Sequence, residues 1–147
     1  IEVDNEVYST ANWTNIDAQT SFSENCDAPT ISIPDSNFEQ ALIDLGYDTN
    51  GLNGNILQSE AESVTSLDVT NKGISNLTGI GAFVNLVELN FRFNNIDNIN
   101  GIENLIHLEI LIGYDNLLTS IDVSENSELT SLAISKSLLY SNKLKGG

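Results

Sequence analysis

Basic residues are scarce in this chain. Five Lys and Arg stand against 21 Asp and Glu among 147 residues, which gives a formal net charge of −16 at pH 7. This charge repels a phosphate backbone and an anionic membrane surface, so we expect no nucleic-acid partner. The acidic residues are scattered along the chain, which is typical of a solvated exterior and leaves cations as suitable companions.

Long apolar runs and cysteine pairs are also missing. No stretch approaches the roughly 20 apolar residues that span a bilayer, and the chain does not open with the basic start and apolar core of a signal peptide. We therefore expect no membrane insertion, with any targeting segment removed or outside this sequence. The single cysteine, Cys26, is a buried thiol, a free reactive thiol or half of a disulfide whose partner is absent from the chain.

The sequence also lacks a recognisable catalytic grouping. A catalytic site needs a nucleophile with a base, paired carboxylates in a cleft, or a metal with an open position. The one histidine, His107, has no serine or cysteine at an informative spacing, so we interpret it as an exposed structural residue. One histidine and one cysteine also argue against a zinc site. We expect a protein that is not an enzyme.

What the sequence does contain is an internal repeat. The pattern L-x-x-L-x-F-x-x-N-x-I-x-x-I begins at Leu86 and recurs from Leu108, with Gly113 in the place of the phenylalanine. Looser copies begin at Val64 and Leu129, so the four starts are 22, 22 and 21 residues apart. This spacing lies within the range of about 20 to 29 residues that is typical of leucine-rich repeats.

The repeat predicts an α/β fold, a right-handed leucine-rich-repeat solenoid with one short parallel strand per coil and an irregular or 3₁₀ convex side. One coil cannot bury its apolar side alone, so successive coils stack, and each L-x-L step points two side chains inward. Asn94 and Asn116 occupy turn positions where an amide can bond unpaired backbone groups. Gly113 stands where a large side chain is expected, which predicts a packing gap.

A capped helix is predicted ahead of the repeats, over residues 35–45. Asp35 or Ser36 is the expected N-cap, and Gly46 ends the run. Three apolar side chains fall on one face of this helix: Phe38, Leu42 and Leu45. We expect the helix to close the N-terminal end of the solenoid, as repeat proteins require. No cap is evident at the other end, where residues 137–147 also fit a second register.

The segment that follows the helix, residues 48–60, resembles an EF-hand calcium loop of the form D-x-N-x-D-G-x-I-x-x-x-E, if Leu52 is a one-residue insertion. Its candidate calcium ligands are Asp48, Asn50, Asn53, Asn55 and Glu60. The alternative is a Gly/Asn-rich turn that joins the helix to the first coil, which the insertion and the asparagines at aspartate positions favour.

The concave face of the solenoid is where we expect a ligand, because the residues beside each inward pair point outward in rows. The rows are Asp68, Asn90, Ile112 and Ala133; Thr70, Arg92, Tyr114 and Ser135; and Asn71, Phe93, Asp115 and Lys136. The ligand-binding candidates are Glu88, Asn90, Arg92, Phe93, Tyr114 and Asp115. Exposed aromatic and Arg side chains dominate interface energetics and can stack on a sugar ring. The alternative is that Phe93 turns partly into the core and Arg92 neutralises Glu88 or Asp115.

The segment 33–132 resembles leucine-rich-repeat proteins of Bacteroidetes, especially marine flavobacteria. The likeness rests on I-P-D-x-N-F-x-x-A-L-I-x-L-G at 33–46, V-T-S-L-D-V at 64–69 and L-T-S-I-D-V-S at 118–124. The 22-residue coils, with N-x-I-x-x-I at 94–99, also resemble those of internalins. The resemblance implies an extracellular or bacterial cell-surface location and the binding of a protein or a glycan.

Residues 1–32 resemble the closing cap of a preceding repeat block in such proteins, whose cysteine would pair with Cys26. The expected organisation is therefore a leader at 1–32, a helical cap and loop at 33–63 and repeats at 64–147, within a longer protein. The leading hypothesis for function is a binding or adhesion module. The alternatives are a structural spacer and an accessory domain of a larger polysaccharide-processing enzyme.

Overall fold

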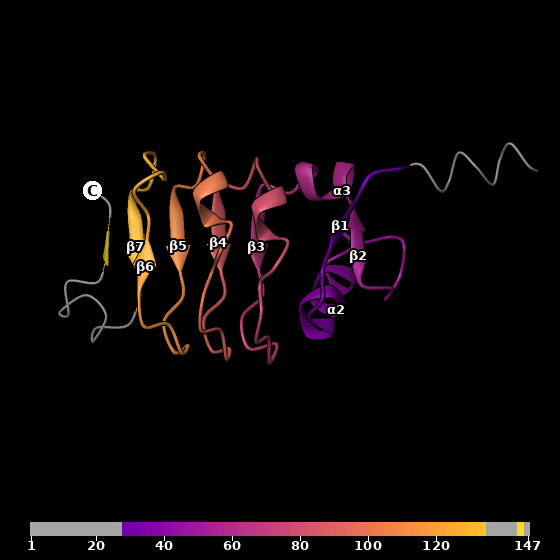
Figure 1. Cartoon of the computed structure of the whole chain (residues 1–147), viewed down its shortest axis with the longest axis horizontal. Helices are drawn as coiled ribbons and strands as arrows, with labels where there is room; N and C mark the ends of the chain where they lie inside the picture. The colour runs from indigo at the N-terminus through magenta and orange to yellow at the C-terminus, as the bar shows by residue number, and fades with distance from the viewer. Residues whose placement is uncertain (1–27, 135–143, 146–147) are drawn as a thin grey trace, which may run out of the picture.

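The computed structural model describes residues 28–134 and the strand at 144–145 (Figure 1). Cys26, nearly all of the predicted leader, the row members Ser135 and Lys136, and most of the C-terminal segment with two registers lie outside the described residues. In Figure 1, a small helical unit lies at one end of a row of parallel strands.

The N-terminal unit contains two short strands and two helices: β1 (Thr30–Ser32), α2 (Ser36–Asp44), β2 (Asn55–Leu57) and α3 (Gln58–Ser63). The strands β1 and β2 pair antiparallel, with Ile31 opposite Ile56. Helix α2 begins where the sequence predicts, because the Asp35 carboxylate accepts the N–H groups of Asn37 and Phe38. Leu45 lies beyond the helix and is 43% exposed, so its predicted place on the buried face is wrong.

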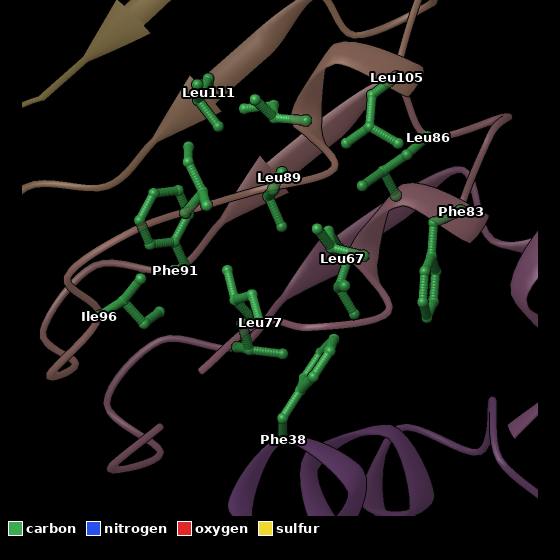
Figure 2. Close-up of a cluster of buried hydrophobic side chains, with 14 of the residues drawn as sticks. Phe38, Leu67, Leu77, Phe83, Leu86, Leu89, Phe91, Ile96, Leu105 and Leu111 are labelled. Carbon is green, nitrogen blue, oxygen red and sulfur yellow. The ribbon is translucent and has the colours of Figure 1, made fainter. Parts of the chain in front are cut away.

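Helix α2 is fastened to the first repeat by polar and apolar contacts. The second carboxylate oxygen of Asp35 accepts the backbone N–H groups of Ser75 and Asn76 at 2.9 and 3.0 Å. The ring of Phe38 lies 6.3 Å from that of Phe83, and in Figure 2 it points from the helix into the repeat core. One aspartate therefore both starts the helix and ties it to the repeats.

The four strands β3 (Ser66–Asp68), β4 (Glu88–Asn90), β5 (Ile110–Ile112) and β7 (Ser131–Ala133) form one parallel sheet in that order. Ser66 pairs with Glu88, Glu88 with Ile110, and Ile110 with Ser131, so the register advances by 22, 22 and 21 residues. The predicted short parallel strand in each repeat is confirmed. The inward residues Leu67, Leu89 and Leu111 are at most 1% exposed.

The segments that lead from one strand of this sheet to the next, which we call the return side, differ from one repeat to the next. Two 3₁₀ helices, η1 (Ile80–Ala82) and η2 (Ile102–Asn104), follow the first two strands of the sheet. After β5 the chain instead forms β6 (Ile121–Asp122), which pairs in parallel with β8 (Leu144–Lys145). The side chains between the two sides form one continuous core, part of which is drawn in Figure 2.

The asparagines predicted to serve the turns do so. Asn94 accepts the N–H groups of Lys72 and Ile74 at 3.1 and 3.0 Å, and its amide donates to the carbonyls of Val69 and Phe91. Asn116 repeats the arrangement one repeat later. Each of these side chains therefore links its own turn to the preceding repeat.

The predicted packing gap at Gly113 is wrong. A Cβ atom at this position would lie 2.6 Å from Cε2 of Phe91 and closer still to Cζ. The Phe91 ring, which is fully buried, therefore occupies the space that a side chain at 113 would take. Phe91 and Gly113 occupy the same position in neighbouring repeats, and the large side chain of one fills the space left by the absent side chain of the other.

Candidate functional site

Three of the predicted ligand-binding residues come together just beyond the ends of β4 and β5, and we call Arg92, Phe93 and Tyr114 the aromatic patch. Backbone pairing continues past the strands here. The N–H of Phe93 donates to the carbonyl of Tyr114 at 3.2 Å, and the N–H of Asn71 donates to that of Arg92 at 3.1 Å. The side chains of neighbouring repeats are thereby held side by side.

The members of the aromatic patch contact one another directly. Arg92 Nη1 donates to Tyr114 Oη at 3.0 Å, and the guanidinium carbon lies 5.8 Å from the centre of the tyrosine ring. The rings of Phe93 and Tyr114 meet edge to face, with centroids 5.5 Å apart and planes at 84°. Tyr114 is therefore fixed by a neighbour on each side.

Phe93 is the solvent-exposed member of the patch, and Arg92 and Tyr114 are half-buried. Phe93 is 48% exposed, so it does not take the alternative course of turning inward. Arg92 forms its hydrogen bond with Tyr114, and the ion pairs of residues 28–134 involve other side chains, Lys72 with Asp44 and His107 with Glu128. Arg92 therefore forms no ion pair with Glu88 or Asp115 within residues 28–134, and its hydrogen bond to Tyr114 holds the guanidinium in place.

Phe93 has an unusual backbone. It lies in the left-handed region with φ of +57°, at a position shared by Asn71 and Asp115, whose φ values are +54° and +56°. Asparagine and aspartate tolerate this region, whereas a bulky side chain there costs about 1 to 2 kcal/mol. A large exposed ring in an unfavourable conformation is a feature that clusters at binding sites.

A polar pair supports the patch from the preceding strands. Asn90, 7% exposed, donates from its amide to the Asp68 carboxylate at 3.2 Å. Burial raises the pKa of Asp68, but hydrogen bonds from Thr70 and Asn90 and the positive charge of Arg92 outweigh it, so the pKa falls below its usual value. The side chain of Asn90 is buried and bonded to Asp68, and its role as a ligand contact stays a prediction.

Of the two further predicted candidates, Asp115 is exposed next to Tyr114, whereas Glu88 is partly exposed at the start of β4, the end of the strand away from the patch. One buried polar atom of the patch, Arg92 Nε, has no hydrogen-bond partner within the described residues. Thr70, which belongs to the same predicted row as Arg92, bonds to Asp68 and was not predicted as a ligand-binding residue.

The second candidate site is the loop between α2 and α3. Asp48 is 3% exposed and Glu39, on α2, is 2% exposed. A single oxygen of Glu39 accepts three successive backbone N–H groups, those of Asn53, Gly54 and Asn55, at 2.8, 2.7 and 3.1 Å. Glu39 was missed by the sequence analysis, although its position between Phe38 and Leu42 already placed it near the buried face of the helix.

The asparagines of this loop bond mostly to one another. Asn50 donates its amide to Asn55 Oδ1 at 3.0 Å, and Asn53 donates to Asn50 Oδ1 at 2.9 Å. In the described part of the chain, no three side chains of His, Cys, Asp or Glu gather so as to hold a metal ion. Hydrogen bonds within the loop and bonds to the Glu39 carboxylate therefore fix much of its conformation.

The Asp48 carboxylate lies in an environment that disfavours its negative charge. Burial raises the pKa of Asp48; the backbone N–H of Asn50 opposes this effect, while the negative charges of Glu39 and Glu60 add to it. One oxygen of Asp48 and one of Glu60 are buried without a hydrogen-bond partner. These two predicted ligands are thus brought together, with Asn50 and Asn55 beside them.

The one histidine is exposed, as predicted. His107 Nδ1 lies 3.4 Å from Glu128 Oε2, and both side chains are about half exposed. No helix among the described residues is long and apolar enough to cross a membrane.

Neither a family model nor a curated protein matches this sequence. Solved structures do match it. The functional domain of InlJ from Listeria monocytogenes, which includes a cysteine ladder, is similar with 28% identity and a TM-score of 0.63 over 71% of this chain and 24% of that chain. The internalin inlF from Listeria monocytogenes str. 4b F2365 is similar with 26% identity and a TM-score of 0.61 over 68% and 29% of the two chains.

This chain thus spans about a quarter of the length of the solved structures that it matches. The neighbours support an internalin-like leucine-rich-repeat fold, which agrees with the internalin resemblance of the repeats. The resemblance to proteins of Bacteroidetes stays a prediction.

Proposed function

We propose that this chain is a non-catalytic binding module, a leucine-rich-repeat solenoid of a bacterial surface or secreted protein, which recognises a protein or polysaccharide through the aromatic patch. The observation that carries the proposal is the edge-to-face pair of the exposed Phe93 and the half-buried Tyr114, with Arg92 bonded to the tyrosine. The likeness to two internalins supports a binding role over a catalytic one.

Preorganisation is the physical argument for binding. Ordering a flexible side chain at an interface costs about 0.5 to 1.5 kcal/mol, and the Tyr114 ring is already held by two contacts before any ligand arrives. Tyrosine, arginine and phenylalanine supply large contact areas, and a tyrosine or phenylalanine face can stack on a sugar or an apolar side chain. Asp115 would provide part of a polar rim, and Glu88 would extend the surface along β4.

The test is a ligand screen followed by paired variants. The full chain is screened on a glycan array and against a panel of bacterial and host surface proteins. Changing Arg92→Ala together with Tyr114→Ala should weaken binding of any hit by about 30-fold or more, the effect of losing a hot spot of about 2 kcal/mol. The circular dichroism spectrum should stay unchanged.

A matched control removes apolar side chains from another face. Val84 and Ile106 are 37% and 52% exposed at equivalent positions of two repeats, each between a 3₁₀ helix and the next strand. The double change Val84→Ala/Ile106→Ala should leave the affinity as it is. If the control weakens binding as strongly as the patch variant, the binding surface lies elsewhere; if no ligand emerges from the screen, the spacer hypothesis gains.

A further inference from the structure

Two buried carboxylate oxygens in the cap face no donor. Asp48 Oδ1 accepts the N–H of Asn50 at 3.1 Å, and Glu60 Oε1 accepts the N–H and the hydroxyl of Thr49. The other oxygen of each group, Asp48 Oδ2 and Glu60 Oε2, is buried without a hydrogen-bond partner. Each carboxylate is therefore anchored through one oxygen and presents the second.

No basic side chain of the described residues compensates these groups. Between residues 28 and 134 the chain has one lysine and one arginine. Lys72 lies 4.0 Å from Asp44 on α2, and Arg92 is bonded to Tyr114 in the aromatic patch. Glu39 adds a third buried negative charge, which is met by backbone N–H groups alone.

Buried carboxylates without partners are costly, and the cost is removed when a cation binds or a proton is taken up. Asp48 lies at the start of the loop and Glu60 in the helix α3 that follows it, and Thr49, the neighbour of Asp48, bonds directly to Glu60. The neutral amide oxygens of Asn50 and Asn55 lie in the same loop. This donor set consists of hard oxygens and includes no nitrogen or sulfur ligand.

We propose that the 48–60 loop holds a calcium ion between Asp48 Oδ2 and Glu60 Oε2, with water completing the shell. Calcium accepts six to eight oxygen ligands in irregular geometry, including amide and backbone oxygens, so it does not need a third carboxylate. Magnesium requires a near-ideal octahedron and fits an asparagine-rich loop less well. The proposal is independent of any ligand of the aromatic patch.

The structure also narrows the set of ligands that the sequence suggests. Asn53 Oδ1 accepts the N–H of Asn55 at 3.1 Å, and the Asn53 amide donates to Asn50, so this side chain serves the turn. Glu39 holds the backbone of the same turn. The side-chain oxygens of Asn50 and Asn55 accept the amides of Asn53 and Asn50 in the same way. We therefore assign the three asparagines and Glu39 to shaping the loop, and Asp48 and Glu60 to binding the ion.

The experiment measures the thermal unfolding of the full chain in chelator, in calcium and in magnesium, and follows calcium binding directly by calorimetry. A ligand that binds the folded state alone raises the melting temperature, by about 5 °C or more when calcium is at 100 times its dissociation constant. Magnesium at the same concentration should give a smaller rise.

Three variants locate the site. Asp48→Asn and Glu60→Gln should each lose most of the calcium-induced rise and weaken calcium affinity at least tenfold. Glu62→Gln, on the same helix as Glu60 and with its carboxylate bonded to Gln58, should keep the full response and is the matched control. In chelator, Asp48→Asn should melt no lower than the natural chain, because the change removes an unpaired buried charge.

Two results would overturn the proposal. One is a natural chain that melts at the same temperature in chelator and in millimolar calcium and shows no heat of binding. The other is a calcium response that survives in both Asp48→Asn and Glu60→Gln, which would place the ion elsewhere. If Asp48→Asn does not fold, Glu60→Gln and the calorimetry of the natural chain decide the question.

Discussion

The strand side and the return side of the repeats obey different rules. On the strand side, β3, β4, β5 and β7 keep one continuous parallel register, and a left-handed residue follows three of them at Asn71, Phe93 and Asp115. On the return side, the conformation changes from the 3₁₀ helices η1 and η2 to the strand β6. The same stack is thus uniform on one side and variable on the other.

Single residues explain the change on the return side. Gly79 and Gly101 precede η1 and η2 with φ of +103° and +101°, a conformation that glycine adopts readily. The repeat that begins at Leu108 has no glycine in this stretch; there the Asp122 carboxylate accepts the N–H and the hydroxyl of Ser124. Backbone pairing governs the strand side, which therefore tolerates changes of side chain; the return side depends on which residue starts each turn.

The largest effect is expected where a side chain joins two repeats on the strand side. Changing Asn94→Ala leaves the part-buried N–H of Lys72 and the buried N–H of Ile74 without an acceptor, and we expect a loss of about 3 kcal/mol of unfolding free energy. Asn116→Ala removes one such acceptor bond, to Ile96, and should cost about half as much. Urea denaturation measures both, and equal losses would contradict the role of the extra bond.

A somewhat smaller loss is expected for Gly113→Ala. The added methyl group overlaps the buried Phe91 ring, and we expect about 2 kcal/mol of destabilisation from overpacking. The second change Phe91→Leu makes room, so the double variant should recover part of the loss. Additive destabilisation in this double-mutant cycle would show that the two positions do not share one volume.

The return side is tested by glycine changes in two settings. Gly101→Ala meets both the left-handed backbone and the nitrogen of Gly81 at 3.0 Å, so we expect a cost of about 1.5 kcal/mol. Gly51→Ala has the same sign of φ, +91°, and no atom within 4 Å of the new methyl group, which isolates the backbone term at about 1 kcal/mol. If Gly101→Ala lowers the unfolding free energy by no more than Gly51→Ala does, the close contact between Gly101 and Gly81 contributes nothing to the cost.

The smallest stability effect is expected at the aromatic patch. Phe93→Asn installs the residue that the preceding repeat has at this position, Asn71, and relieves the backbone strain. It also removes an aromatic pair worth about 0.5 to 1.5 kcal/mol, so the two effects nearly offset and the melting temperature should shift by less than about 2 °C. Ligand binding should nevertheless be lost, whereas retained affinity would remove Phe93 from the proposed surface.

The regular features of the fold could be predicted because they are periodic or local. The L-x-L steps place Leu67, Leu89 and Leu111 in one column, and the Asp35 cap is settled by residues two and three positions away. The turn asparagines follow from the same period. The aromatic patch was also within reach, since Arg92 and Tyr114 occupy one row of the repeat.

Other contacts depend on how distant segments approach each other. Nothing local in the sequence indicates that Glu39 reaches the N–H groups of residues 53–55, or that the Phe91 ring fills the space at Gly113. The same holds for the buried role of Asn90, which a row pattern alone places on the surface. These errors concern side-chain direction, which the period of a repeat does not specify.

The sequence by itself determined the stack of short parallel strands, the capping helix and the row that contains Arg92 and Tyr114, because backbone periodicity and capping act over a few residues. The tertiary structure decided which return segments become 3₁₀ helix or strand, which side chains of neighbouring repeats share one volume, and which oxygens of the 48–60 loop are left unpartnered. The reason is that burial and hydrogen-bond satisfaction depend on the distance between segments that stacking brings together, and a linear pattern does not contain that distance.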